Sequence, residues 1–528
     1  MAKYIMVQGT MSNSGKSFVA AALCRIFHQD GYKAAPFKSQ NMALNSFVTE
    51  EGLEMGRAQV VQAEAAGVKP SVAMNPILLK PTSHMGSQVI VNGEILGNYT
   101  AAEYYKLKKS LVPHIKKALA KLEEEYDIIV IEGAGSPAEI NLKAFDIVNM
   151  GMAKMAGSPV VLVGDIDRGG VFASLYGTVK LLDEDEQAMI KGIIINKFRG
   201  DVKLLEPGLD MIEGLTGIPV LGVIPMENID IEEEDSLAER LGHREKGTGL
   251  DIAVIHLPHI SNFTDFAVLE RMDGISLRYA ESSEELESTN KPDCVILPGT
   301  KNTMADLKWL KESGIDETIK NLAEEKIPVM GICGGFQMLG KRLIDAYGVE
   351  EKGILTGLGL LDSETIFSRE KVRTQARAKV SENIPGWEKL SGMELEGYEI
   401  HMGVTRNLGG CIEFMTVENG RQENEKGHTA GLCNMDGGIC GTYLHGFFDA
   451  PKAAERFAAQ IREKKAERPG SAQPEMENSG NPESGQKAFL SWQEYKEREY
   501  DKLADLVRKS LDMDEIYRIV NQSPLNEG

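Results

Sequence analysis

The sequence lacks any apolar run longer than a β-strand, and it has few cysteines and a deficit of basic residues. Apolar runs this short exclude a membrane-spanning helix. The first residues lead directly into a strand and a glycine loop, so we expect no signal peptide. Six cysteines, at positions 24, 294, 333, 411, 433 and 440, show no metal-ligand spacing and predict no disulfide framework. A net charge of −21 argues against nucleic acid or an anionic membrane as partner, and we expect a cytoplasmic protein.

The chain is long enough for at least two hydrophobic cores. At 528 residues it exceeds the size at which a single core stops growing. Strand-like apolar runs alternate with amphipathic stretches, a pattern typical of α/β folds with mainly parallel sheets. We predict two such domains, each a sheet flanked by helices. The predicted strands are 4–8, 34–37, 128–131, 160–163, 192–195, 220–223, 251–257, 294–297, 329–332 and 441–444.

Changes in composition predict the domain boundaries. The first domain covers 1–226, an acidic connection covers 227–249, and the second domain covers 250–462. Residues 463–487 combine many charges with Pro, Ser and Gly but almost no large apolar side chains, so we expect a disordered insertion. Apolar residues recur at helical spacing within 488–528, and we expect this C-terminal helix to pack on the second domain.

A glycine-rich loop joins the first predicted strand to the first predicted helix. Successive backbone N–H groups in such a loop form an anion-binding nest at a helix N-terminus. Lys16 can reach β- and γ-phosphate oxygens, and the Ser17 hydroxyl suits Mg²⁺. The predicted nucleotide-binding residues of this loop are Gly9, Asn13, Ser14, Gly15, Lys16 and Ser17.

Two further strand ends in this half carry charged side chains. Glu132 follows an apolar strand, where a carboxylate either holds Mg²⁺ together with Ser17 or caps the next turn. Asp165 and Asp167 follow another strand and either bind metal, orient Lys16 or form surface ion pairs. Arg168, which follows Asp167, either binds a phosphate or carboxylate group or takes part in a surface ion pair.

The stretch 327–340 is the most specific chemical signal in the chain. An apolar strand ends at Cys333, with Gly331, Gly334 and Gly335 around it. This pattern predicts a nucleophile elbow, a sharp strand-to-helix turn that tolerates only small neighbours. The turn would aim the Gly334 N–H at a developing oxyanion, and the helix N-terminus would favour the thiolate. The alternative is a core cysteine beside helix-packing glycines.

The Gly-x-Cys-Gly-Gly-x-Gln pattern resembles the nucleophile motif of class I glutamine amidotransferases, and the phosphate loop resembles that of dethiobiotin-synthetase-like ATPases. With the segments 37–46, 54–59, 75–81, 165–173 and 298–303, the chain is similar to the cobyric acid synthase family over nearly everything except 463–487. The resemblance implies a P-loop ATPase-like domain followed by an amidotransferase-like domain. In two places the chain departs from the pattern. His84 stands where an acidic residue is expected. Phe447 stands where the usual triad has a carboxylate, so the third member of the triad is either missing or supplied from elsewhere.

This resemblance implies a ligase that amidates corrinoid side-chain carboxylates with ATP, Mg²⁺ and glutamine. The reaction would convert adenosyl-cobyrinic acid a,c-diamide to adenosyl-cobyric acid through acyl phosphates. Cys333 would attack glutamine with His445 as base. His401 either lines the glutamine pocket or has only a packing role. Gly299 and Gly334 would donate to the oxyanion. In related ATPases an asparagine amide reads adenine, which implies that role for Asn196.

Neutral amides in the first domain suit a substrate that carries both carboxylates and amides, because Asn and Gln donate and accept hydrogen bonds. Turn and cap chemistry is the alternative for each. The predicted substrate-binding residues are Lys38, Gln40, Asn41, Asn45, Arg57, Gln59, Gln88 and Arg168. Two other functions stay open: a cobyrinic acid a,c-diamide synthase or another amide ligase of this architecture, and a partitioning-type regulatory NTPase with a degenerate amidotransferase module. Intact Cys333, His445 and Lys16 argue against the last.

Overall fold

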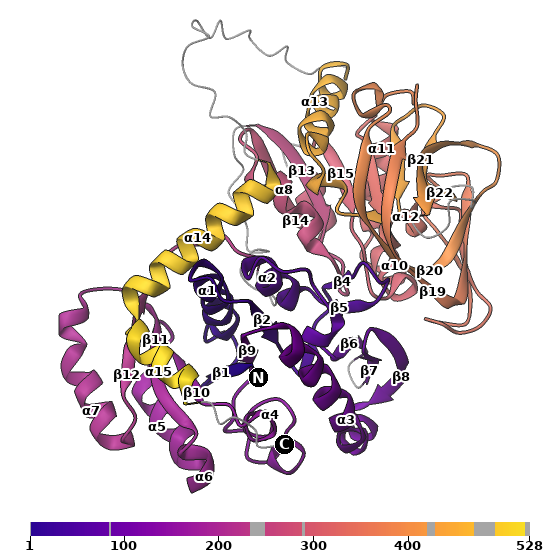
Figure 1. The fold of residues 1–528 in the computed structure, drawn as a ribbon. Helices are drawn as coiled ribbons and strands as arrows, with labels where there is room; N and C mark the ends of the chain where they lie inside the picture. The colour runs from indigo at the N-terminus through magenta and orange to yellow at the C-terminus, as the bar shows by residue number, and fades with distance from the viewer. Residues whose placement is uncertain are drawn as a thin grey trace, which may run out of the picture. The chain divides into compact units, whose positions relative to one another are not determined.

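The computed structural model describes residues 2–83, 86–232, 249–287, 291–419, 428–468 and 491–522, which form two compact units (Figure 1). Unit 1 comprises Met1–Ala43, Leu53–Asp235 and Gln493–Gly528, and unit 2 comprises Leu44–Gly52 and Ser236–Trp492. The chain therefore leaves unit 1 after Ala43, contributes a short segment to unit 2 and returns at Leu53. None of the described helices is both long and apolar enough to cross a membrane.

Among the described residues of unit 1, six parallel strands form the central sheet, in the order β12-β11-β10-β1-β9-β2. Strands buried on both faces are apolar along their length, and that property made all six recognisable in the sequence. Their bounds are β1 (Lys3–Gly9), β2 (Ala34–Phe37), β9 (Ile128–Glu132), β10 (Val160–Asp165), β11 (Ile190–Phe198) and β12 (Val220–Pro225).

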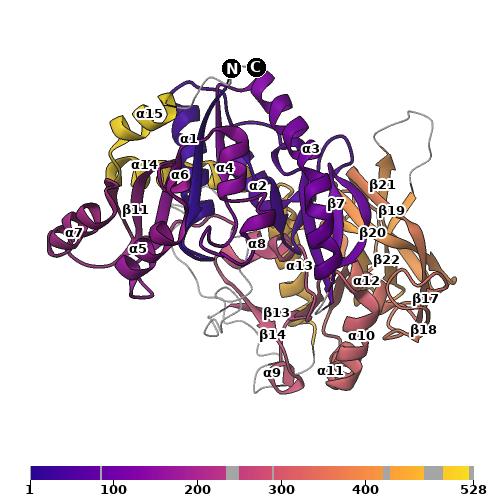
Figure 2. The same cartoon turned by 90° about the horizontal axis from the view of Figure 1, so that it is seen from below.

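A second, four-stranded sheet of unit 1 has the order β3-β6-β7-β8, and α3 lies against β7 and β8 (Figure 2). Helix α3 begins with a capping box, in which Thr100 Oγ1 accepts from the Glu103 N–H and Glu103 Oε2 accepts from the Thr100 N–H. The remaining strands are β3 (Gln40–Met42), β5 (Glu54–Gly56), β6 (Ile77–Ser83), β7 (Gly86–Val91) and β8 (Glu94–Thr100). The helices are α1 (Lys16–Gln29), α2 (Arg57–Ala65), α3 (Ala101–Glu125), α4 (Met150–Ala156), α5 (Val171–Leu181), α6 (Glu184–Gln187) and α7 (Glu206–Thr216).

Two C-terminal helices, α14 (Trp492–Ser510) and α15 (Met513–Asn521), belong to unit 1 from Gln493 onward. Leu503 and Val507 are buried in the same apolar cluster as Val19 of α1. Arg25 Nε donates to Asp501 Oδ1 at 2.9 Å beside this cluster. The expectation that the C-terminal helix packs on the amidotransferase domain is therefore wrong. Helical spacing predicts an apolar face, but it does not say which core that face covers.

Truncating Leu503 tests this packing, because its side chain is fully buried while Leu204 in the same unit is 84% exposed. We expect Leu503→Ala to lower the free energy of unfolding by about 2–5 kcal/mol. The same substitution at Leu204 should change it by less than about 0.5 kcal/mol. Chemical denaturation of both variants measures the difference. Equal stability of the two variants would place α14 outside the core of unit 1.

Within the described part of unit 2, twelve strands form a mixed sheet. Strands β14-β13-β15-β16-β23 are parallel neighbours, and the sheet continues through antiparallel β22, β21 and β19 to β17 and β18. Strand β20 pairs with β19 and β24. Their bounds are β13 (Leu250–Ile255), β14 (Ile275–Ala280), β15 (Cys294–Leu297), β16 (Val329–Ile332), β17 (Arg342–Asp345), β18 (Gly353–Thr356), β19 (Ser363–Val380), β20 (Glu394–Asn407), β21 (Cys411–Asn419), β22 (His428–Asn434), β23 (Ile439–Thr442) and β24 (Leu444–His445).

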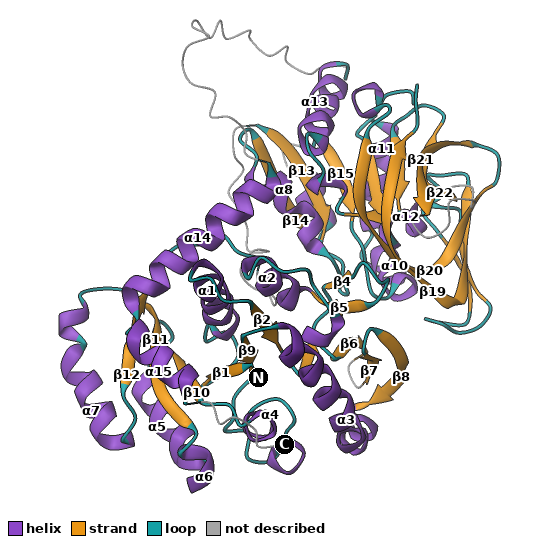
Figure 3. Ribbon diagram, viewed as in Figure 1, coloured by secondary structure: helices purple, strands orange, loops and turns teal. Residues whose placement is uncertain are grey.

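Helices cover the parallel half of this sheet (Figure 3). Helix α12 packs on β16 and β23 and contacts α10, while α13 contacts β13. The helices of unit 2 are α8 (Ala267–Arg271), α9 (Ser283–Glu287), α10 (Thr303–Glu312), α11 (Ile315–Glu324), α12 (Gly334–Leu339) and α13 (Ala453–Ala466), and the segment 44–52 adds β4 (Ser46–Val48). The predicted α/β class of both domains is thus confirmed, and β17–β22 add a mainly antiparallel extension that the sequence analysis did not predict.

Two predicted boundaries shift. Ile231 packs in the core of unit 1 and Glu232 pairs with Arg57, so unit 1 continues past 226 at least to Glu232. Helix α13 continues to Ala466, so the predicted insertion begins too early at 463. The rest of that insertion (469–487), most of the acidic connection (233–248) and His84 lie outside the described residues.

Candidate active sites

The predicted phosphate loop connects β1 to α1. Gly15 is the residue before the helix and has φ 98°, a left-handed conformation that glycine adopts without strain. A Cβ on Gly15 would lie 1.9 Å from Asn196 Nδ2, and one on Gly9 would lie 2.1 Å from Ser14 Oγ. Lys16 curls over the loop, and its Nζ donates to the carbonyls of Met11 at 2.9 Å and Gly135 at 3.1 Å. The loop is therefore closely packed, with its lysine bonded to carbonyls of the loop and of the turn after β9.

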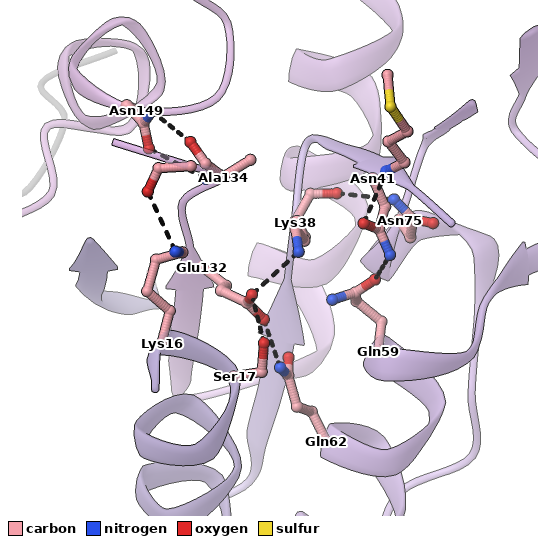
Figure 4. A network of polar contacts seen from close by, with 12 residues as sticks. Lys16, Ser17, Lys38, Asn41, Gln59, Gln62, Asn75, Glu132, Ala134 and Asn149 are labelled. Carbon is pink, nitrogen blue, oxygen red and sulfur yellow. Dashed lines mark hydrogen bonds and ion pairs between the residues drawn. The ribbon is translucent and has the colours of Figure 1, made fainter. Parts of the chain in front are cut away.

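A buried carboxylate network stands beside the loop (Figure 4). Glu132 at the end of β9 accepts from Ser17 Oγ at 2.8 Å, from Lys38 Nζ at 3.0 Å and from Gln62 Nε2 at 2.5 Å. Burial alone would raise the pKa of Glu132, but the Lys38 charge and the three hydrogen bonds outweigh it and hold that pKa below its usual value. The carboxylate is thus ionised and directed at Ser17, so it does more than cap a turn.

Asn196 and Lys197 hold the loop from β11. Asn196 Nδ2 donates to the Ser14 carbonyl at 3.0 Å, and Lys197 Nζ donates to the Asn13 carbonyl at 2.8 Å. Lys197 Nζ also lies 3.1 Å from Asp165 Oδ2. Asp165 therefore reaches the loop through Lys197, a residue that the sequence analysis missed although it directly follows Asn196. The adenine contact of Asn196 stays a prediction.

Several predicted substrate residues gather near this network. Asn41 Nδ2 donates to Gln59 Oε1 at 3.1 Å, while no partner of the buried Gln59 Nε2 is found in the described residues. Gln40 Oε1 accepts from Tyr104 Oη at 2.6 Å. Lys38 belongs to the Glu132 network (Figure 4). The amides of Asn41 and Gln59 thus form a buried pair between β3 and α2.

Other predicted substrate residues lie elsewhere. Arg57 makes a two-pronged, buried ion pair with Glu232, with Nε–Oε2 at 2.6 Å and Nη2–Oε1 at 3.0 Å, which engages its guanidinium inside the protein. Gln88 lies on β7 opposite Lys80. Arg168 is more than half exposed, and its Nε lies 3.9 Å from Asp165 Oδ2. Asn45 belongs to unit 2, where its Oδ1 accepts from the Asn262 N–H at 2.7 Å.

The elbow is built as its glycines predict. Cys333 sits between β16 and α12 with φ 51° and ψ −107°, a backbone conformation that non-glycine residues rarely adopt. A Cβ on Gly335 would lie 2.0 Å from the Leu297 carbonyl oxygen, and one on Gly334 would lie 2.6 Å from Thr300 Cγ2. The Cys333 N–H donates to the Thr442 carbonyl at 2.8 Å, which fixes the turn on β23. The side chain is lifted off the strand end, as a nucleophile requires.

His445 faces the elbow, and Asp265 holds it. Asp265 Oδ2 lies 2.7 Å from His445 Nδ1, and Asp265 Oδ1 accepts from the Gly446 N–H at 2.9 Å. Burial would lower the pKa of His445, but the charges of Asp265 and the Cys333 thiolate and their hydrogen bonds raise it to about 10. Asp265 supplies the carboxylate that is absent at Phe447. The sequence analysis missed it because 180 positions separate the pair and no motif surrounds it.

The other predicted residues of this site fall into two groups. His401 stacks on Tyr443 at 3.7 Å between ring centroids, and its Nδ1 lies 3.0 Å from the Gly403 carbonyl oxygen, so its ring packs against Tyr443. Gly299 lies close to the imidazole, since a Cβ there would be 3.1 Å from His445 Cε1. The described residues provide no hydrogen-bond partner for the N–H groups of Gly299 and Gly334, which leaves both donors available.

Comparison with known proteins matches each unit separately. The family described as CobQ/CobB/MinD/ParA nucleotide binding domain matches residues 5–237, and the CobB/CobQ-like glutamine amidotransferase domain matches residues 251–453. Among solved structures, PurLQS from Thermotoga maritima is similar with a TM-score of 0.30 and 18% identity, over 41% of this chain and 97% of that chain. That similarity is too distant to add to the assignment.

Full-length relatives are much closer. The cobyric acid synthase of Lachnoclostridium phytofermentans is 54% identical, over 99% of this chain and 100% of the relative. That of Ruminiclostridium cellulolyticum is 52% identical over 99% of this chain and 98% of the relative. That of Alkaliphilus metalliredigens is 52% identical over 98% of this chain and 99% of the relative. The chain therefore belongs to the cobyric acid synthase family of glutamine-dependent amide ligases.

Proposed function

We propose that this protein converts adenosyl-cobyrinic acid a,c-diamide to adenosyl-cobyric acid by ATP- and glutamine-dependent amidation. The observation that carries the proposal is the alignment of Cys333, His445 and Asp265 on an amidotransferase unit whose chain also forms a phosphate loop. One half is equipped to release ammonia from glutamine, and the other to activate a carboxylate with ATP. An amide ligase needs both reactions.

The geometry of unit 2 supports glutamine hydrolysis. The Cys333 thiolate attacks the carboxamide carbon of glutamine, and the N–H groups of Gly299 and Gly334 stabilise the oxyanion. The imidazolium of His445 protonates the departing ammonia, and a thioester forms. Neutral His445 then takes a proton from water, which attacks the thioester and releases glutamate. Asp265 fixes the ring through Nδ1 and stabilises its charged form.

Asp265→Asn tests that role of the carboxylate. We expect glutaminase kcat to fall on the order of 10²-fold, since the ring loses its orientation. Without the Asp265 charge the pKa of His445 falls from about 10, so the alkaline limb of the kcat/KM profile should move to lower pH. The exposed Asp273→Asn is the matched control. A slower enzyme with an unmoved alkaline limb would show that Asp265 acts only by packing.

Carboxylate activation is assigned to unit 1. The corrinoid carboxylate attacks the γ-phosphorus of ATP, ADP leaves, and ammonia then displaces phosphate from the acyl phosphate. Lys16 and the loop N–H groups offset the charge that develops on the phosphates. The hydroxyl of Ser17 and the carboxylate of Glu132 are hard oxygen donors and fit Mg²⁺.

The described residues include no group of three His, Cys, Asp or Glu side chains that could hold a metal by themselves, so Mg²⁺ would depend on ATP for further ligands. When bound, it would neutralise phosphate charge.

Mass spectrometry of the corrinoid tests the function directly. After incubation with ATP, Mg²⁺, glutamine and the a,c-diamide, each converted carboxyl should show replacement of OH by NH₂. No reaction with the a,c-diamide, but amidation of cobyrinic acid itself, would instead identify an a,c-diamide synthase. Absence of glutaminase and ligase activity together would favour a regulatory NTPase.

A further inference from the structure

A segment of unit 2 comes from the middle of the unit 1 sequence. Leu44–Gly52 belongs to unit 2, whereas its neighbours Ala43 and Leu53 belong to unit 1. Val48 is buried against Tyr398 and Ile400 of β20, and the Phe47 ring meets Tyr398 edge-on at 5.3 Å between centroids. The Ile400 carbonyl in turn lies 3.5 Å from the Cys333 sulfur. The segment therefore packs on the strand that borders the nucleophile.

The segment also holds the turn that carries Asp265. The Asn262 N–H donates to Asn45 Oδ1 at 2.7 Å, and the Ser46 N–H donates to Asn262 Oδ1 at 3.3 Å. Asn262 is left-handed at φ 54°, and its carbonyl accepts from the Asp265 N–H at 3.0 Å. Asp265 then holds His445 Nδ1 at 2.7 Å. A continuous chain of hydrogen bonds thus runs from Asn45 to the imidazole.

A second path reaches the face of the same ring. Tyr398 Oη donates to the Ser46 carbonyl at 3.2 Å, and the Tyr398 ring stacks on His445 with centroids 5.3 Å apart and planes at 21°. Asn45, Ser46 and Asn262 are each at most 3% exposed. Both supports of the imidazole, the carboxylate at its edge and the aromatic ring on its face, are therefore fixed by Asn45 and Ser46.

We propose that Leu44–Gly52 is a positioning segment, which sets His445 for glutamine hydrolysis and makes that hydrolysis respond to ligands of unit 1. Peptide bonds join its two ends to Ala43 and Leu53, next to the predicted substrate residues Asn41 and Gln59. A shift of those residues on corrinoid binding is carried along the backbone to Asn45 and Ser46. This response to the corrinoid rests on the proposed function, whereas the positioning of His445 does not.

Glutaminase kinetics of the full-length Asn45→Ala variant test the proposal. With glutamine alone we expect kcat to fall on the order of 10- to 100-fold while KM stays unchanged, because the nucleophile pocket is intact but its base is misplaced. Stimulation of glutaminase by ATP plus the corrinoid should be lost. Asn45→Asp keeps the acceptor for Asn262 and should restore most of kcat. Glu396→Gln, an exposed position on β20, is the control.

Tyr398→Phe provides an independent variant, since it removes only the hydroxyl that reaches Ser46. It should lower kcat several-fold and weaken the stimulation. Wild-type kcat and wild-type stimulation in Asn45→Ala or Tyr398→Phe would overturn the proposal. It would also be overturned if ammonia-driven synthesis fell as much as glutaminase activity, because the segment would then belong to the corrinoid site. Failure of the wild-type protein to convert the a,c-diamide would refute the proposed function, while the kcat measured on glutamine alone would still test the positioning.

Discussion

Cys333→Ala should abolish synthesis driven by glutamine and leave synthesis driven by free ammonia intact. Removing the nucleophile of a catalytic triad typically lowers kcat by roughly 10⁴–10⁶-fold, because the remaining groups cannot form a covalent intermediate. Ammonia bypasses this step, and the loop and Glu132 network belong to the other unit. Initial rates of amide formation with each nitrogen source, at saturating ATP and corrinoid, measure the ratio.

The substitution is conservative for the fold. Alanine keeps the Cβ, so the strained backbone at φ 51° carries the same side-chain stub as in the native protein. Cys411→Ala removes a thiol from the same unit, away from the elbow, and should keep both activities. If the Cys333 variant were equally inactive with ammonia, the cysteine would be structural or the two units would not work separately.

Lys16→Ala should lose synthesis with either nitrogen source, by about 10³-fold, because carboxylate activation precedes attack by ammonia. In the structure Lys16 Nζ bridges the carbonyls of Met11 and Gly135, and we expect phosphate oxygens to replace these acceptors when ATP binds. Ammonia-driven synthesis and ATP hydrolysis are the two measurements. Hydrolysis of glutamine should continue, without coupling to amide formation.

Lys117→Ala, which removes an exposed lysine from α3 of the same unit, serves as the matched control. It should retain wild-type rates with both nitrogen sources. An unchanged ammonia-driven rate in the Lys16 variant would remove the loop from the mechanism.

Local signals of the sequence predicted well what local geometry determines. The loop at 9–17 and the elbow at Cys333 depend on glycines at which an added Cβ would clash with nearby atoms. Such constraints can be recognised from a few consecutive residues of the sequence. The six strands of the unit 1 sheet and β13, β15, β16 and β23 of unit 2 were recognisable because they are buried on both faces, whereas the partly exposed edge strand β14 was missed. These features therefore needed no knowledge of the tertiary structure.

Long-range pairings could not be predicted in the same way. Asp265 reaches His445, Glu232 neutralises Arg57, and α14 covers a core built mainly from the first half of the chain. Each depends on which surface a segment meets after folding, and a carboxylate or an apolar helix face is compatible with many partners. The assignment of Arg57 to the substrate was plausible from chemistry alone, and only the buried pair with Glu232 argues against it.

The interleaved course of the chain limits how a gene for this protein could be divided. Unit 1 is assembled from three stretches and unit 2 from two, with crossings after Ala43, Gly52, Asp235 and Trp492. Suppose that the gene were cut near the codon for residue 235 to give two products. The first product would keep the Leu44–Gly52 segment, which belongs to unit 2, and it would lack α14 and α15, which belong to unit 1. The first product would lose the part of its apolar cluster that α14 and α15 supply, and the second product would lose Val48, which is buried against Tyr398 and Ile400. Evolution is thus not expected to exchange one activity for another by replacing one half of the gene. We expect the two activities to be inherited together.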